Sequence, residues 1–248
     1  MRLILFTMTL VVSTIPGFGQ NRREVDRQVD SASANLTGRW TWIATCVASR
    51  PSGRFEITSQ RPDGDFSGAF SNANPTDTGS ITGQQRRLLV EFQRQIPGAG
   101  EQQWTGGVEQ NGASLRMEGK IEGAGGPCTF SATSTTGTPR KPGSSTKITG
   151  QWTWTAACGA GSSTGRFQIV NQARDGDFSG VFSNASPGDT GTIHGKQRGL
   201  LMEFNRQIPE LGEQQWTGGL AQTGRGLMME GRIEGIGGPC TFSATIGH

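Results

Sequence analysis

The sequence predicts an all-β protein built from two tandem antiparallel up-and-down β-barrels of about eight strands each, each with one disulfide. Three observations lead to this prediction. Residues 37–133 and 149–245 repeat one another without a gap, at a constant offset of 112 residues that relates Cys46 to Cys158. Within each repeat, apolar residues alternate with polar ones between turn residues. Each repeat also carries two cysteines at matched positions.

The repeat unit is too long for a solenoid and has the length of a small domain, so each copy is expected to build its own core. Residues 134–148 join the copies and are rich in Ser, Thr, Gly and Pro, which predicts a semi-extended linker. A mechanism shared by both copies can use only residues that both contain.

Residues 1–19 have the features of a secretory signal peptide. Arg2 precedes an apolar run from Leu3 to Val12, and residues 17–19 (Gly-Phe-Gly) form a small-x-small cleavage site. The run is shorter than the ~20 residues that a membrane-spanning helix needs, so no membrane span is expected. Residues 20–36 are polar and of mixed charge, which predicts a flexible leader. The protein is therefore expected to be secreted or periplasmic.

The strands follow from a period of two. Val90 and Phe92 fall on one face of their run, and Glu91 falls on the other. Asp-Gly, Asn-Gly and Gly-rich segments separate such runs. In the first repeat, strands are expected to begin near Trp40, Arg54, Phe66, Ser80, Leu88, Gln102, Leu115 and Thr129.

The cysteines indicate how the strands close. In an up-and-down meander, Cys46 at the end of the first strand and Cys128 at the start of the last strand lie at the same end, and closure makes these strands neighbours. The sequence therefore predicts the disulfides Cys46–Cys128 and Cys158–Cys240. A two-sheet sandwich stapled by the same bonds is the alternative. Metal binding is disfavoured because no paired histidine accompanies the distant cysteines.

Several functional classes are disfavoured by composition. The only two histidines are His194 and His248, and the first repeat has Thr82 in the place of His194, so the first copy has no histidine for a catalytic triad. Asp63 and Asp65 suit a hairpin turn better than a calcium loop. A net charge of +3 with short basic groups does not indicate nucleic-acid binding. No enzyme activity, cofactor or metal is expected. Three glutamates on outward phases are expected to be surface charges: Glu91, Glu118 and Glu122.

Three segments resemble strands of the avidin and streptavidin family: Thr37-Gly38-Arg39-Trp40, Gly64-Asp65-Phe66-Ser67-Gly68-Ala69-Phe70 and Gln103-Trp104-Thr105-Gly106. Their order and approximate spacing are similar to those of the family's opening strand, G-x-x-x-G strand and W-[ST]-G strand. The first segment is also similar to the G-x-W opening of lipocalins. The resemblance implies a calycin-like barrel in which Trp104 and Trp216 form an aromatic wall against a ligand. The later tryptophans of the biotin site have no counterpart, so biotin specificity is not implied.

Candidate ligand-binding residues share the inward phase or lie in the loops at the disulfide end. An inward arginine needs a carboxylate, carbonyls or a ligand anion, unless the strand end is exposed and the arginine is solvated. Inward tryptophans are either core or a binding platform, and the loop residues are either a rim or ordinary turn residues. The candidates are Trp40, Trp42, Arg94, Trp104, Trp152, Trp154, Arg206 and Trp216 inside, and Asn72, Asp77, Asn184 and Asp189 at the rim.

Together these features predict a secreted, non-enzymatic binding protein with two ligand sites at the barrel mouths, for a small molecule or a glycan. Two sites on one tether would favour a repetitive target such as a cell surface. The alternative is an inhibitor or adhesin that binds another protein through its loops. A structural protein without a site is a third possibility.

Overall fold

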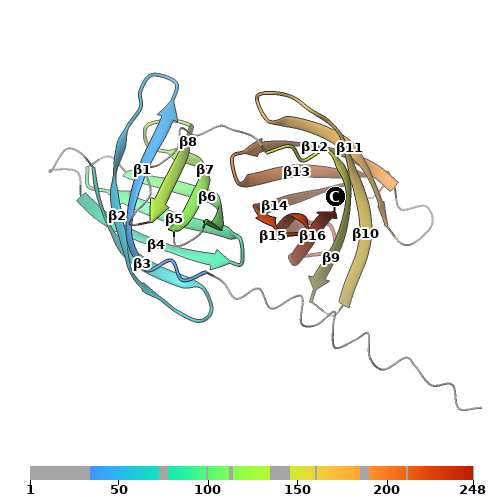
Figure 1. Ribbon diagram of the computed structural model, residues 1–248, viewed down its shortest axis with the longest axis horizontal. Coiled ribbons are helices and arrows are strands. Elements are labelled where there is room, and N and C mark those ends of the chain that lie inside the picture. The colour runs from blue at the N-terminus through green and yellow to red at the C-terminus, as the bar shows by residue number, and fades with distance from the viewer. Residues whose placement is uncertain are drawn as a thin grey trace, which may run out of the picture. The chain divides into compact units, whose positions relative to one another are not determined.

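The computed structural model describes residues 34–72, 78–98, 100–111, 114–134, 146–159, 161–184, 190–210 and 212–247 (Figure 1). The predicted signal peptide and most of the predicted leader lie outside these ranges. Both barrels belong to one compact unit, Ala32–His248. No helix in the described ranges is long and apolar enough to cross a membrane.

The first barrel is a closed antiparallel meander of eight strands in sequence order. Its strands are β1 (Gly38–Cys46), β2 (Ser52–Gln60), β3 (Asp65–Asn72), β4 (Thr78–Arg86), β5 (Leu89–Ile96), β6 (Gly100–Asn111), β7 (Ser114–Gly123) and β8 (Cys128–Ser134). Each strand begins within two residues of its predicted start. Because β8 pairs with β1, the barrel has no free edge, and the sandwich alternative is wrong.

The second barrel repeats this topology, and β16 pairs with β9 to close it. Its strands are β9 (Gly150–Cys158), β10 (Gly161–Gln172), β11 (Asp177–Asn184), β12 (Thr190–Arg198), β13 (Leu201–Ile208), β14 (Gly212–Thr223), β15 (Gly226–Gly235) and β16 (Cys240–Gly247). The predicted fold class is therefore confirmed: two all-β barrels, each with its own disulfide.

The disulfides fasten the seams. Cys46 is paired with Cys128 in the register of β1 and β8, and a bond joins their sulfur atoms. Cys158 and Cys240 have the same relationship between β9 and β16. Both predicted pairings are confirmed, and neither bond connects the two barrels.

Each barrel is filled by its own cluster of inward side chains. In the first, the indole of Trp40 is stacked on Phe55 with ring centroids 5.6 Å apart, and Phe92 is stacked on Trp104 at 5.2 Å. Such aromatic pairs add to the stabilisation from burial alone. The alternation in the sequence therefore correctly predicts which side chains point inward.

The predicted leader and linker are each too long, because their last apolar residue belongs to a barrel core. Leu36 is buried, and its carbonyl accepts a 2.9 Å hydrogen bond from Trp40 Nε1. Ile148 lies in the same way beneath Trp152, again with a 2.9 Å bond to Nε1. The alternation argument did not reach these residues because they precede the first strand of each barrel. Both close the barrel end opposite the disulfide.

The prediction that Glu118 is a surface charge is also wrong. Glu118 points outward from β7, as the alternation requires, but only 2% of it is exposed. The outer face of β6 and its neighbours packs against β14 and its neighbours in the second barrel. A residue on the outward phase can therefore be buried between barrels.

Candidate functional site

A pocket of about 390 Å³ opens at the disulfide end of the first barrel. Its inner wall consists of side chains from β1, β5, β6 and β7, and its rim consists of the turns next to the disulfide. Residues on the wall and rim are Trp42, Cys46, Ser49, Pro51, Arg94, Ile96, Gln102, Trp104, Ile121, Ala124, Gly125 and Cys128. The volume lies within the range of small-molecule sites, about 300–1,000 Å³.

Arg94 supplies the charge of this pocket. It extends inward from β5, and only 3% of it is exposed. Its guanidinium carbon lies 3.7 Å from the centre of the Phe70 ring and 5.5 Å from that of Trp42. This geometry is that of a cation–π contact, which stabilises a guanidinium removed from water. The prediction that Arg94 is inward is confirmed, and the alternative of a solvated strand end is wrong.

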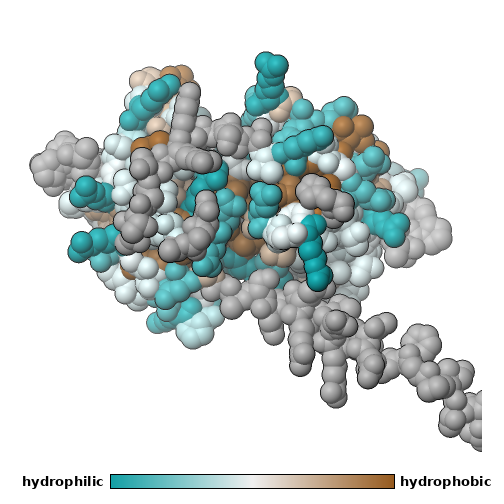
Figure 2. Space-filling view, in the orientation of Figure 1, coloured by the Kyte–Doolittle hydropathy of each residue, from teal (hydrophilic) through white to brown (hydrophobic). Residues whose placement is uncertain are grey.

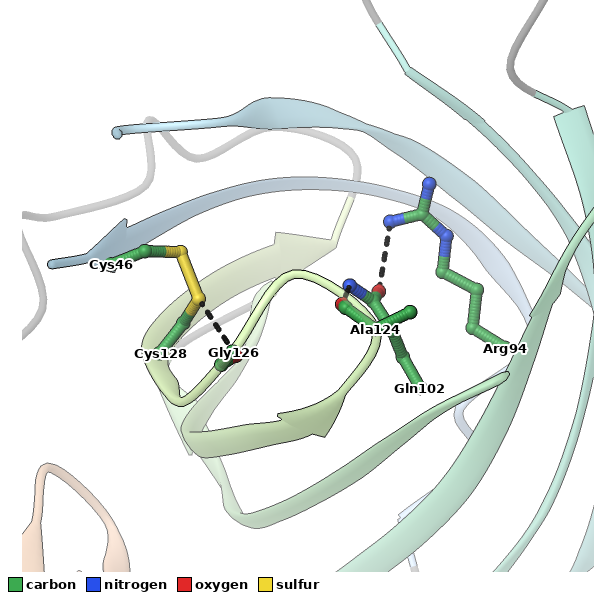
Figure 3. The surroundings of a disulfide bond; sticks show 6 residues. All are labelled: Cys46, Arg94, Gln102, Ala124, Gly126 and Cys128. Carbon is green, nitrogen blue, oxygen red and sulfur yellow. Dashed lines mark hydrogen bonds between the residues drawn. A yellow bond between two sulfur atoms is a disulfide. The ribbon is translucent and has the colours of Figure 1, made fainter. Parts of the chain in front are cut away.

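Gln102 connects Arg94 to the turn beside the disulfide (Figure 3). Arg94 Nη1 donates to Gln102 Oε1 at 3.4 Å, and Gln102 Nε2 donates to the carbonyl of Ala124 at 2.6 Å. Ala124 begins the turn that leads to Cys128. The guanidinium is therefore oriented by a side chain that is itself held by the β7–β8 turn.

Trp104 is the centre of the aromatic wall. Its ring lies 5.2 Å from Trp42 in an edge-to-face arrangement and 4.7 Å from Phe130. The indole Nε1 is buried and has no hydrogen-bond partner among the described residues. A buried donor without a partner costs about 1–3 kcal/mol, so an acceptor within the pocket would recover this free energy.

The pocket combines apolar walls, an oriented guanidinium and a buried indole donor. This combination fits a small ligand that has an apolar body and an anionic or hydrogen-bond-accepting group. Among the described residues that line the pocket there is no carboxylate and no histidine.

The second barrel reproduces the arginine, the glutamine and the tryptophan pair. Arg206 Nη1 donates to Gln214 Oε1 at 3.3 Å, and Trp154 meets Trp216 at 5.3 Å. Here, however, the Phe182 ring lies against both tryptophans, with centroid distances of 5.3 Å and 5.6 Å. Phe182 therefore occupies interior space next to the aromatic wall. The pocket described for the first barrel is the one used below.

The structure brings together three of the predicted residues of the first barrel, Trp42, Arg94 and Trp104, and separates Trp40 from them. Trp40 lies at the closed end with Leu36, as does Trp152 in the second barrel. Asp77 and Asp189 lie outside the described residues, as do the side chains of Asn72 and Asn184.

Sequence reasoning missed Gln102, Ile96 and Ile121 as pocket residues. Ile96 and Ile121 share the inward phase with Arg94 and Trp104, so the alternation could have identified them. Gln102 belongs to the same face of β6 as Trp104, two residues away, and its polar side chain at the strand end was the available signal.

No group of three or more histidine, cysteine, aspartate or glutamate residues in the described ranges could hold a metal ion. Asp63 Oδ1 accepts from the backbone N–H of Asp65 at 3.2 Å, which is the hydrogen bond of an Asx turn. His194 is exposed on β12, and His248 lies outside the described residues.

Comparison with known proteins gives no family. No protein-family model and no curated protein matches the chain. A crystal structure of a Bacteroides fragilis protein, provisionally described as an outer membrane protein, is similar over 86% of this chain and 98% of its own. The identity is 10% and the TM-score 0.28, so this similarity carries no argument about either chain's function.

Proposed function

We propose that this chain is a secreted, non-enzymatic binding protein whose first barrel holds a small ligand with an apolar body and an anionic or hydrogen-bond-accepting group. The observation that carries the proposal is the buried Trp104 Nε1, which has no partner among the described residues although its indole lines a pocket of about 390 Å³. An acceptor on the ligand would satisfy this donor while its apolar part covers the indole.

Arg94 supports the choice of an anionic group. A guanidinium is always charged at physiological pH and is costly to bury. Its contacts with Phe70, Trp42 and Gln102 orient the guanidinium in the wall of the pocket. A carboxylate, sulfonate or similar group at the mouth would therefore gain a charge-assisted hydrogen bond.

The resemblance to avidins and lipocalins supports a site inside the barrel, because Trp104 belongs to the segment that resembles the avidin W-[ST]-G strand. Biotin is not expected, since the later tryptophans of that site are missing from the sequence.

Export and the lack of catalysis have separate support. Disulfides persist in oxidising compartments, and each barrel contains one. Of the lining residues that the structure describes, Ser49 alone has a hydroxyl side chain, and none is a histidine or carboxylate that could activate it.

Fluorescence titration with 8-anilinonaphthalene-1-sulfonate, an apolar aromatic anion, tests the proposal. We expect saturable binding with one site per chain. A medium-chain alkanoate should then displace this probe about tenfold better than the alcohol of the same length, equivalent to ~1.4 kcal/mol.

Displacement of the probe by a neutral oligosaccharide distinguishes a glycan ligand from the proposed anionic ligand. Displacement by the oligosaccharide but not by the alkanoate would contradict the proposal, as would non-saturable binding of the probe. An inhibitor or adhesin would instead bind its protein target with unchanged affinity after the pocket is filled by the probe.

A further inference from the structure

The contacts between the two barrels occur in pairs related by the 112-residue repeat. Arg232 Nη2 of the second barrel lies 3.0 Å from Glu91 Oε1 of the first. Lys120 Nζ of the first lies 2.9 Å from Glu203 Oε1 of the second. Lys120 is the counterpart of Arg232, and Glu203 is the counterpart of Glu91. Reciprocal contacts of this kind define an isologous, two-fold interface, as in a homodimer.

The backbones meet in the same reciprocal way at two glycines. A Cβ added at Gly219 would lie 1.9 Å from the carbonyl oxygen of Leu88 in the other barrel. A Cβ added at Gly107 would lie 2.1 Å from the carbonyl oxygen of Leu200. The hairpin turn of each barrel therefore rests on a glycine of the other, and a larger residue would separate them.

Apolar residues next to these glycines are buried without entering a barrel core. Leu89 pairs with Gly107 across β5 and β6, and Leu201 pairs with Gly219 across β13 and β14. These two leucines are 1% and 0% exposed, yet neither belongs to an interior cluster. The packing of one barrel on the other accounts for their burial.

Each barrel also buries one glutamate at this face, and the partner arginine comes from a different place in each. In the second barrel, Glu230 Oε1 lies 3.0 Å from Nη1 of Arg87, which belongs to the first barrel. In the first barrel, Glu118 Oε2 instead lies 2.6 Å from Nη2 of Arg116, which belongs to the same strand. A buried carboxylate that lost its partner would be strongly destabilising.

The repeats differ at the two positions that supply the arginine partners of these glutamates. The counterpart of Arg116 is Met228, so the second barrel has no arginine of its own at that position. The counterpart of Arg87 is Gly199, so the second barrel has no arginine at this position that could pair with Glu118 across the interface. A cavity of about 110 Å³ lies beside Gly199 and Glu118. The two-fold interface therefore keeps a cation for each buried carboxylate although the repeats have diverged.

From these reciprocal contacts we infer that this face, called here the exchange face, is a docking surface for a second copy of this chain, on which the first barrel of one chain meets the second barrel of the other. Two chains can exchange barrels through it, so that the first barrel of each packs on the second barrel of the other. Each core and each disulfide lies within one barrel, so the barrels can separate without unfolding. Domain exchange of this kind produces dimers with no new type of contact.

Charge reversal in full chains tests the inference. The variant E91R/K120E reverses the rim charges of the first barrel, and E203R/R232E reverses those of the second. Each chain alone then has like charges across its own exchange face. When the chains are mixed, both exchange faces of a heterodimer are complementary. All four substitutions in one chain restore complementarity within that chain and serve as the control.

Native mass spectrometry of the mixture, after partial denaturation and refolding, should show a 1:1 heterodimer with twice the mass of one chain. The wild-type and four-fold variants should remain monomeric under the same conditions. Only monomers in the mixture would overturn the inference. Equal dimerisation of each variant alone would overturn it too, since the reversed charges of two identical barrels are complementary, and such dimers would show that like barrels pair in place of a first barrel with a second.

A glycine substitution provides a readout if the charge variants fail to fold. Gly219→Ala should increase amide hydrogen exchange at Leu88 and Leu89 at least tenfold by loosening the exchange face. Gly161→Ala is the matched control, because no atom lies within 4 Å of its added Cβ. Identical exchange at Leu88 and Leu89 in the two variants would show that the face does not hold the barrels together, and would overturn the inference.

Discussion

Cys46 lies directly opposite Cys128 in the ladder between β1 and β8, and the bond between them spans 82 residues of sequence. The bond thus joins the first strand of the barrel to the last, at the seam where a meander would otherwise open. The same relationship joins Cys158 to Cys240.

Replacing both cysteines of the first seam by alanine should lower the free energy of unfolding by about 4 kcal/mol, because the chain entropy of the unfolded state rises. Guanidinium unfolding followed by tryptophan fluorescence measures this change. The C158A/C240A variant should lose a similar amount, since its bond also spans 82 residues. A loss confined to one barrel's bond would contradict the symmetric account.

Leu36→Ala should destabilise the protein by about 2–5 kcal/mol, because a buried leucine is removed from the closed end of the first barrel. The denaturant midpoint measures this. Val47→Ala is the matched control: Val47 is 95% exposed, so its truncation should change stability by less than about 0.5 kcal/mol. Equal effects of the two substitutions would mean that Leu36 belongs to a leader and not to the core.

The closed barrel could be predicted from the sequence because it depends on local alternation and on two cysteines. Val90, Phe92 and Arg94 occupy the face that a period of two assigns to them. The burial of Glu118 could not be predicted in this way, because it depends on a second barrel packed on the outer face. The available signals were the apolar pair Leu88-Leu89 and the repeated double glycine after Trp104-Thr105.

The candidate site was predicted in part for a related reason. Alternation determines the side of a strand on which a residue lies, but not its depth in the barrel. Trp40 and Trp42 share a phase, yet Trp40 bonds to Leu36 at the closed end and only Trp42 lines the pocket. In the second barrel Phe182 packs against both tryptophans, and the repeat could not predict this difference, since the counterpart of Phe182 is also a phenylalanine, Phe70.

Glu230 should make the protein more stable as the pH falls from neutrality. Burial raises the pKa of its carboxyl above 4.5, and the attraction and hydrogen bond of Arg87 and a hydrogen bond from Ser243 offset this only in part. The folded state therefore binds the proton more tightly than the unfolded state. Its unfavourable contribution, present at neutral pH, is relieved as the pH falls through the raised pKa.

Glu230→Gln should remove this dependence, because an amide does not ionise in this range. The free energy of unfolding of the variant, relative to wild type, should be higher at pH 7 than at pH 4.5. Glu234→Gln, on the same strand with a more exposed side chain, is the control and should leave the dependence unchanged. Parallel pH profiles for wild type and Glu230→Gln would contradict the assignment.

Trp104→Phe should weaken binding of 8-anilinonaphthalene-1-sulfonate about tenfold, equivalent to ~1.4 kcal/mol, because it removes the indole N–H and part of the apolar wall. Fluorescence titration measures the affinity, and guanidinium unfolding measures the stability, which should fall only modestly. Trp216→Phe makes the same change in the second barrel and should leave the affinity unchanged. A large loss of stability with unchanged affinity would identify Trp104 as a packing residue only.

The most direct test of the proposed site is a calorimetric titration of the same probe into Arg94→Met and Arg206→Met. Methionine replaces the apolar stem of the arginine with one of similar size and removes the charged guanidinium. Arg94→Met should lower the affinity at least tenfold, and Arg206→Met should leave it within about twofold of wild type. Equal losses in both variants, or no loss in Arg94→Met, would contradict the account of an anion-accepting pocket in the first barrel.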